Sequence, residues 1–301
     1  MSARIAVVIP AWNEEATIGD VVRDVLASAD ATVIVVDNGS SDATAERAFK
    51  AGATVVNQPA RGYGRACMAG AAAALNDAEV LVFMDGDGSD RCEDIPALLT
   101  RIDGGDALVL GVRKGAAVEA GSIAPAARFG NWLSGLLIGL FWGRRIHDLS
   151  PLKAIRADAY QTLPLREQTY GWTIELITSA LSARMQVAEV PVGYRKRRGG
   201  VSKVSGNLGA STRAGYRILL TIARVRSRTL PRAVRGSLAG ALAGTTLLAG
   251  LAWWLLVKAP SGPRVLVTMC LVAWPLLITT IALGALGSRL VPGRNQEEVR
   301  R

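Results

Sequence analysis

Two carboxylates follow an apolar run near the first third of the chain. Asp85 and Asp87 flank Gly86 directly after residues 80–84, and Asp90 comes three residues later. An apolar run of strand-forming residues that ends in a glycine-rich turn predicts a strand buried on both faces. Parallel sheets bind ligands beyond the carboxyl ends of their strands, where paired carboxylates suit a hard divalent cation that carries phosphate oxygens. The alternative is a glycine loop whose aspartates cap the next helix.

Composition excludes several other kinds of site. Half of the 301 residues are apolar, which is enough for one large domain and an appendage. The three cysteines show neither paired nor metal-ligand spacing, so we expect a reducing compartment and no disulfide framework. His147 is the single histidine, which excludes His-rich metal sites. Apolar residues begin as a short strand at Ile5, so no cleaved signal peptide is expected.

The net charge of +10 comes from one segment. Residues 195–235 hold 12 Lys and Arg and no acidic residue, whereas the rest of the chain carries 23 basic and 25 acidic residues. The segment precedes a long apolar tail. This position favours anionic lipid and phosphate partners over nucleic acid.

Strand and helix patterns alternate in short units before the two aspartates. The expected strands are 5–9, 32–36 and 53–57, and the expected helices are 17–27, 43–51 and 66–75. This alternation predicts an α/β fold with parallel strands. Gly62 and Gly64 precede the third helix, where glycines either cradle phosphate or allow close helix packing. Their spacing does not match the dinucleotide pattern G-x-G-x-x-G.

Four motifs, in this order, resemble glycosyltransferase family 2, whose members have the GT-A fold. They are Val8-Ile-Pro-Ala-Trp-Asn-Glu-Glu15, Val35-Val-Asp-Asn-Gly-Ser-Ser-Asp42, Gly62-Tyr-Gly and Asp85-Gly-Asp87. The nearer likeness is to the dolichyl- and polyprenyl-phosphate mannose or glucose synthases. The resemblance implies a GT-A nucleotide-sugar-binding domain with a mostly parallel central sheet.

The resemblance also implies roles for individual residues. Asp85 and Asp87 would bind the donor diphosphate through Mg2+ or Mn2+, and Asp37 would hydrogen-bond the base or ribose. Asn38 stands where the family usually has a second aspartate. The full set expected to bind the nucleotide sugar is Pro10, Trp12, Glu14, Asp37, Gly62, Gly64, Asp85, Gly86, Arg113 and Arg197.

Three further charged residues allow two interpretations each. Arg113, at the end of an expected strand 107–113, could meet phosphate or be a solvated charge. Asp148 lies in a segment that resembles Asp-x-x-Ser-Gly-Phe-Arg, with Pro151 in place of glycine. It would either face the acceptor or hold its own loop. Glu175 would lie near the sugar or complement the start of a helix.

The segment Glu189 to Lys203 resembles the element that ends the catalytic domain of these synthases, and its residues 195–203 form a basic loop. Leaving group and acceptor both bring anionic oxygens to one site. Arginines and a lysine on a glycine-hinged loop can close over them. We therefore expect Arg197, Arg198 and Lys203 to act there, with a solvated charge run as the alternative. The expected catalytic residues are Asp87, Asp148, Glu175, Arg198 and Lys203.

The tail predicts a membrane anchor. Residues 237–257 and 265–287 are uncharged runs of 21 and 23 residues, both above the roughly twenty that cross a bilayer. Arginines flank the pair on both sides, which predicts an integral membrane protein with a cytoplasmic catalytic domain. The apolar run Phe129 to Trp142 has 14 residues, too few to span a bilayer, so it predicts a core or membrane-surface helix. The expected organisation is a catalytic domain 1–205, a basic amphipathic segment 206–235, a helical hairpin 236–290 and a cytoplasmic tail 291–301.

Together these features predict the transfer of a hexose from GDP-mannose or UDP-glucose to polyprenyl phosphate, and the resemblance implies that the transfer proceeds with inversion. The metal and the basic loop would stabilise the departing diphosphate. Another lipid or a soluble acceptor remains an alternative, and the sequence leaves the oligomeric state open, a homo-oligomer included. Asp85-Gly-Asp87-Gly-Ser also matches the nucleophile loop of haloacid-dehalogenase-type phosphohydrolases, but three strands precede it here. A non-catalytic membrane scaffold is the third alternative.

Overall fold

The computed structural model of the protein describes residues 4–199, 221–222 and 224–227. The chain divides into two compact units, residues 1–137 with 145–222, and residues 138–144 with 223–301. Among the helices that the structure describes, none has the length and apolar character to cross a bilayer. The predicted hairpin, the tail, Lys203 and most of the basic amphipathic segment lie outside the described residues.

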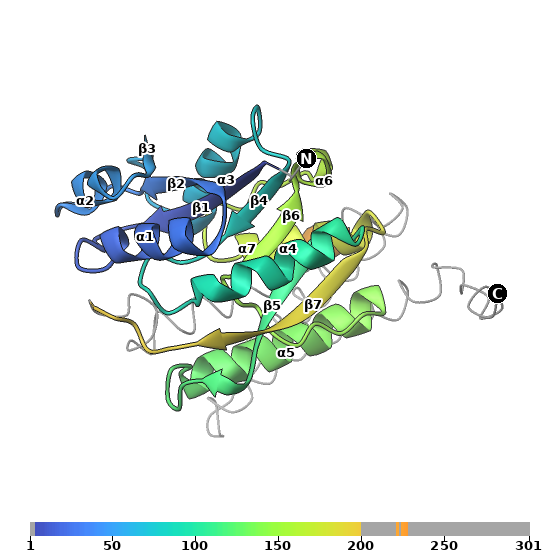
Figure 1. Ribbon diagram of the computed structural model, residues 1–301. Helices are drawn as coiled ribbons and strands as arrows, with labels where there is room; N and C mark the ends of the chain where they lie inside the picture. Colours follow the sequence, from blue (N-terminus) through green and yellow to red (C-terminus); the bar gives the residue numbers. More distant parts are fainter. Residues whose placement is uncertain (1–3, 200–220, 223, 228–301) are drawn as a thin grey trace, which may run out of the picture. The chain divides into compact units, whose positions relative to one another are not determined.

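A seven-stranded sheet forms the centre of the first unit (Figure 1). Its order is β3-β2-β1-β4-β6-β5-β7. The strands are β1 (Ile5–Ala11), β2 (Ala31–Asp37), β3 (Thr54–Asn57), β4 (Val80–Phe83), β5 (Leu108–Val118), β6 (Lys153–Arg156) and β7 (Val187–Tyr194). Within this sheet β6 alone runs against its neighbours, β4 and β5. The expectation of a mostly parallel sheet is therefore confirmed, although neither β6 nor β7 was predicted.

The helices follow the apolar spacing of the sequence. They are α1 (Ile18–Ser28), α2 (Thr44–Lys50), α3 (Tyr63–Ala74), α4 (Ile95–Asp103), α5 (Pro125–Trp142), α6 (Ala157–Thr162) and α7 (Trp172–Ser182), with a short 3-10 turn, η1 (Cys92–Asp94), before α4. Six of the seven described helices overlap segments for which the sequence predicts helix, and for α4 that predicted segment is residues 94–102. The short α6 was not predicted.

Alternate residues along the strands face opposite layers, as the period of a strand requires. Val7 and Ile9 of β1 belong to a buried apolar cluster with residues of α1 and α4. On the other face, Phe83 of β4 packs edge-on against Trp172 of α7, with 4.8 Å between ring centroids. β4 is buried at all four of its residues, as expected for a strand covered on both faces. The loop after β4 therefore leaves the middle of the sheet.

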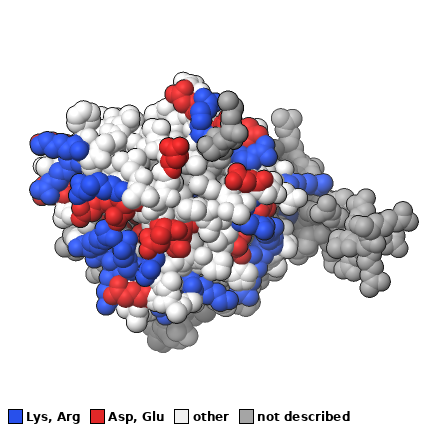
Figure 2. Space-filling model, viewed as in Figure 1, with Lys and Arg blue, Asp and Glu red and all other residues white. Residues whose placement is uncertain are grey.

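Charged side chains of both signs are mixed on the face drawn in Figure 2, so this face carries no continuous basic surface. Most of the basic segment 195–235 lies outside the described residues.

Helix α3 approaches the sheet closely at Gly70. A Cβ at this position would lie 2.3 Å from Val8 Cγ1 and 2.8 Å from Val36 Cγ2. Both valines are buried in the sheet, so neither can move aside easily.

We expect Gly70→Ala to lower the free energy of unfolding by about 1–3 kcal/mol, because overpacking outweighs the better helix propensity of alanine. Gly130→Ala in α5 is the matched control, since within the described part of the chain a Cβ there would meet no atom within 4 Å beyond its own helix backbone and chain neighbours. The control should be neutral or stabilising in urea unfolding. Equal stability of both variants would contradict the close packing of α3.

Candidate active site

The carboxyl ends of three neighbouring strands bring the predicted donor-binding residues together. Ala11 at the end of β1 pairs with Asp37 at the end of β2, and Val8 pairs with Phe83 at the end of β4. Trp12 and Glu14 follow β1, and Asp85 and Asp87 follow β4. These segments therefore leave the same edge of the sheet.

The loop after β4 crowds three carboxylates into six residues. Asp90 is 1% exposed and its Oδ2 accepts the backbone N–H of Asp85 at 3.0 Å. Oδ1 of Asp87 accepts the backbone N–H of Ser89 at 2.9 Å and also its hydroxyl. Burial raises the pKa of Asp85 and Asp90, and repulsion among the carboxylates raises both further.

Lys153 brings a positive charge to this loop from inside the sheet. It is the first residue of β6, pairs with Phe83 across the sheet and is fully buried. Its Nζ donates to the carbonyl of Pro151 at 2.8 Å and lies 5.5 Å from the ring centroid of Trp172. Burial lowers the pKa of Lys153, whereas Cys67 and the aspartates act in the opposite direction.

This loop suits a divalent cation that is coordinated partly by the protein and partly by a substrate. Among the described residues, no group of three His, Cys, Asp or Glu side chains is arranged to hold a metal. Mg2+ commonly binds through only one or two carboxylates and completes its shell with water and substrate phosphates. The buried Oδ1 of Asp90 has no hydrogen-bond partner in the described part of the chain. A cation at Asp85 and Asp87 would offset the burial and mutual repulsion that raise the pKa of Asp85 and Asp90.

Residues 195–199 of the basic loop lie across the aspartate loop. The backbone N–H groups of Arg195 and Arg198 donate to the carbonyls of Ser89, at 2.9 Å, and Asp87, at 3.1 Å. Arg195 Nε also donates to the carbonyl of Gly88 at 2.9 Å. The structure therefore places the backbone of the basic loop against the aspartate loop, and Lys203 lies outside the described residues.

Arg197 forms ion pairs with two of the predicted residues. Its Nη2 lies 2.7 Å from Glu14 Oε1, and its Nε lies 3.2 Å from Asp87 Oδ2. Arg198 pairs instead with Asp24 of α1, with Nη1 2.8 Å from Oδ2. Two adjacent arginines thus hold different carboxylates.

Asp148 is held by a network of donors. Its carboxylate accepts a bidentate pair from Arg113, at 2.7 Å for both Nε and Nη2. It also accepts the backbone N–H groups of Arg113 and Leu149 and the side-chain amide of Asn131. Both charged side chains are less than 10% exposed. These are the contacts of the loop-holding interpretation, and Arg113 is not a solvated charge.

Glu175 is buried and accepts the backbone N–H groups of Arg166 and Glu167, at 2.7 and 2.5 Å. The loop that Glu175 holds packs closely against the start of α3. A Cβ on Gly62 would lie 2.3 Å from the carbonyl oxygen of Gln168, and one on Gly64 would lie 2.2 Å from that of Glu167. Close packing therefore accounts for both glycines.

The contacts of Asn38 account for an amide where the family usually has a second aspartate. Its Nδ2 donates to the carbonyls of Gln58 and Ala60, and its Oδ1 accepts the N–H of Gly62, all at 2.8 Å. An aspartate has no N–H to donate to the two carbonyls. The loop that Asn38 holds carries Arg61, whose guanidinium lies 3.7 Å from the ring centroid of Trp12.

Two other predicted donor-binding residues lie at the same edge of the sheet. Pro10 lies in β1, and Oδ1 of Asp37 accepts the N–H of Ser40 at 2.9 Å.

Comparison with known proteins identifies the domain. Residues 6–163, more than half of the chain, match the model of the family described as Glycosyl transferase family 2. The chain belongs to glycosyltransferase family 2. The expected enzyme class and the GT-A type α/β fold are therefore confirmed.

Several curated relatives share this family 2 domain. An uncharacterized glycosyltransferase of Mycobacterium tuberculosis is 36% identical over 208 residues, which cover 69% of this chain and 92% of the relative. The dolichyl-phosphate hexose transferase of Haloferax volcanii is 34% identical and covers 65% of this chain and 84% of its own. The polyprenol monophosphomannose synthase of Mycolicibacterium smegmatis is 30% identical, covering 68% and 82%.

A solved structure is similar over most of the described chain. It is glucosyl-3-phosphoglycerate synthase from Mycobacterium tuberculosis in complex with Mn2+, uridine-diphosphate-glucose and phosphoglyceric acid. The TM-score is 0.61 at 26% identity, and the match covers 74% of this chain and 80% of that one. Neighbours of this family 2 chain therefore bind a nucleotide sugar together with a divalent metal.

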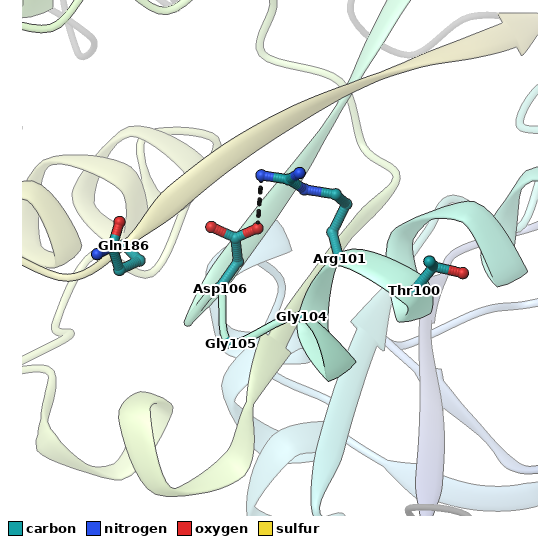
Figure 3. A pocket seen from close by; sticks show the side chains of 6 residues that line it. All are labelled: Thr100, Arg101, Gly104, Gly105, Asp106 and Gln186. Atoms are coloured by element: carbon teal, nitrogen blue, oxygen red, sulfur yellow. Dashed lines mark ion pairs between the residues drawn. The ribbon is translucent and has the colours of Figure 1, made fainter. Parts of the chain in front are cut away.

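A cavity lies away from the predicted site residues. It has a volume of about 370 Å³ and is lined by Thr100, Arg101, Gly104, Gly105, Asp106 and Gln186 (Figure 3). Its residues precede the first residues of β5 and β7, at the opposite end of those strands from the aspartate loop. Arg101 and Asp106 pair across it at 2.8 Å. The cavity therefore has no part in the site.

Sequence reasoning missed three polar residues of the family 2 site. Lys153 is the single charge within the apolar residues 152–155, a signal of a buried functional charge. Asn131 interrupts the apolar run of α5 and reaches Asp148. No sequence signal predicts that Arg61 covers Trp12.

The buried Arg113–Asp148 pair gives a stability test. Asp148→Ala should lower the free energy of unfolding by about 3–5 kcal/mol, because Arg113 is left buried without its partner. Asp158→Ala, which breaks an exposed pair with Arg156, should cost less than about 1 kcal/mol in the same urea titration. A stable Asp148→Ala variant that has lost activity would favour the acceptor-facing role.

The aspartate loop gives a pH test. Burial and the neighbouring Asp87 and Asp90 raise the pKa of Asp85 from 3.8 to about 8. The folded protein therefore keeps a proton that the unfolded chain releases, and the free energy of unfolding falls as pH rises through this range. In EDTA, we expect Asp85→Asn to raise Tm at pH 8, with a smaller effect at pH 5. A lower Tm than wild type at pH 8 would refute this account of the loop.

Proposed function

We propose that this chain transfers a hexose from a nucleotide sugar to a polyprenyl phosphate at a membrane surface. The observation that carries the proposal is the meeting of Asp85 and Asp87 with Arg197 at one edge of the sheet. Curated relatives named dolichyl-phosphate hexose transferase and polyprenol monophosphomannose synthase support it.

The donor would occupy the edge formed by β1, β2 and β4. Trp12, Asp37 and the loop that Asn38 holds would contact the nucleoside, and Asp85 and Asp87 would hold Mg2+ or Mn2+. The bound cation would supply positive charge to the departing diphosphate. Arg197 and Arg198 would add charge-assisted hydrogen bonds to the same oxygens, where negative charge grows in the transition state.

The acceptor would approach from the side of Arg113, Asn131 and Asp148. Arg113 uses two of its five N–H groups on Asp148, and this pair would fix the guanidinium for an incoming phosphate. A phosphate acceptor is anionic at neutral pH, so the reaction needs no strong general base. Asp148 and Glu175 would then act as positioning residues. Lys203 would join the loop of arginines.

Exposed apolar side chains along α5 suit a membrane setting. Phe129 is 62% exposed, Trp132 is 50% exposed and Leu136 is 43% exposed, at the spacing of one helical face. Residues 237–257 and 265–287 would anchor the chain, with the catalytic domain cytoplasmic. A soluble phosphorylated acceptor is the second candidate, because the similar solved structure holds phosphoglyceric acid.

The decisive assay supplies membranes containing the full chain with Mn2+, polyprenyl phosphate and radiolabelled GDP-mannose or UDP-glucose. Label should enter the organic phase from one donor, and Asp87→Ala should reduce this transfer by about 100-fold or more, because the charge on the departing diphosphate loses its counter-ion. Asp158→Asn, on the exposed surface, is the control. Full transfer by Asp87→Ala would refute the proposed site. A parallel assay replaces polyprenyl phosphate with phosphoglyceric acid, and transfer in that assay alone would select the soluble acceptor.

A further inference from the structure

Arg197 contacts the carboxylate oxygen of Asp87 that is best placed to receive a cation. Asp87 has two such oxygens, and Oδ1 accepts both hydrogen bonds from Ser89. Oδ2 faces Arg197 Nε at 3.2 Å. A metal that binds through Oδ2 must therefore approach a guanidinium that already carries a positive charge.

Backbone contacts hold Arg197 in this position. Arg195 and Arg198, on either side of it, donate to the carbonyls of Ser89 and Asp87. A Cβ on Gly88 would lie 3.0 Å from Arg198 Cδ, so the two loops touch where Gly88 has a φ of +74°. The backbone of Arg197 is thus held beside the aspartate loop in the described chain.

Glu14 gives Arg197 a second carboxylate. Its Oε1 lies 2.7 Å from Arg197 Nη2, and its side chain is 9% exposed. The backbone of Glu14 is also fixed, since its carbonyl accepts the N–H groups of Thr17 and Ile18 at the start of α1. Arg197 can therefore release Asp87 and still remain beside the site through Glu14.

We propose that Arg197 competes with the divalent cation for Asp87, so that the metal binds tightly only together with a nucleoside diphosphate. The diphosphate supplies new anionic oxygens for the guanidinium, and Asp87 Oδ2 then turns to the metal. Arg197 thereby links metal binding to donor binding. This inference rests on the proposed metal site at Asp85 and Asp87 but requires neither the sugar nor the acceptor to be known.

The test measures Mn2+ affinity rather than transfer. Free Mn2+ is followed by electron paramagnetic resonance as the purified full chain is titrated, first alone and then with UDP or GDP. Wild type should bind Mn2+ weakly alone and at least about tenfold more tightly with one of the nucleotides. Arg197→Gln should bind Mn2+ alone about tenfold more tightly than wild type, and the gain from the nucleotide should shrink.

Two variants make the result specific. Lys196→Gln removes the positive charge that precedes Arg197, which pairs with Glu119 rather than Asp87, and should change Mn2+ affinity by less than about twofold. Arg197→Lys keeps the charge and should stay near wild type. The inference is overturned if Arg197→Gln leaves Mn2+ affinity unchanged or weaker, or if Lys196→Gln raises it equally. Failure of the hexose-transfer assay with these Mn2+ results intact would refute only the proposed reaction.

Discussion

Negative charge is concentrated where β4 ends, and much of the surrounding structure compensates for it. Asp85 and Asp90 are carboxylates in a place where burial disfavours their charged forms. Two cations lie next to these carboxylates. Lys153 belongs to the sheet strand beside β4, and Arg197 belongs to the basic loop and pairs with Asp87. The site is thus a balance between fixed anions and cations that arrive from separate parts of the sequence. A ligand that carries both signs, such as a metal with a diphosphate, can enter such a balance without leaving charge unpaired.

Polar side chains fix the loops around this charge. Asn38, Asp148 and Glu175 each form hydrogen bonds to loop backbone. Asn38 and Glu175 bond loops elsewhere in the sequence, whereas Asp148 bonds both the adjacent Leu149 and the distant Arg113. Each forms at least two such hydrogen bonds, and these bonds are stronger where burial excludes water. The loops at this edge are therefore ordered by side chains rather than by regular secondary structure. Such order lets a binding site be formed in advance of its ligand.

The sequence allowed prediction of features that depend on local pattern. β1, β2 and β4 are runs of β-branched residues, and the aspartate loop follows directly from the glycines around Asp87. β6 and β7 were missed because they are defined by partners far along the chain, and β5 extends to Val118 because it continues beside β7. For the same reason the partners of Asp148 and Glu175 could not be predicted, although their importance could. The membrane hairpin remains a prediction.

The reversed direction of β6 has a consequence for how such a chain can diverge. Because β6 runs backwards, the connection from β5 through α5 to Lys153 both leaves and returns at the edge that carries the aspartates. Asn131 and Asp148 lie on this excursion, whereas Asp37, Asp85 and Asp87 lie before it. Substitutions or insertions in residues 119–152 can therefore alter one wall of the site while the strands on the other side keep their register. The site can therefore diverge on the side formed by residues 119–152 while the side formed by β1, β2 and β4 is kept.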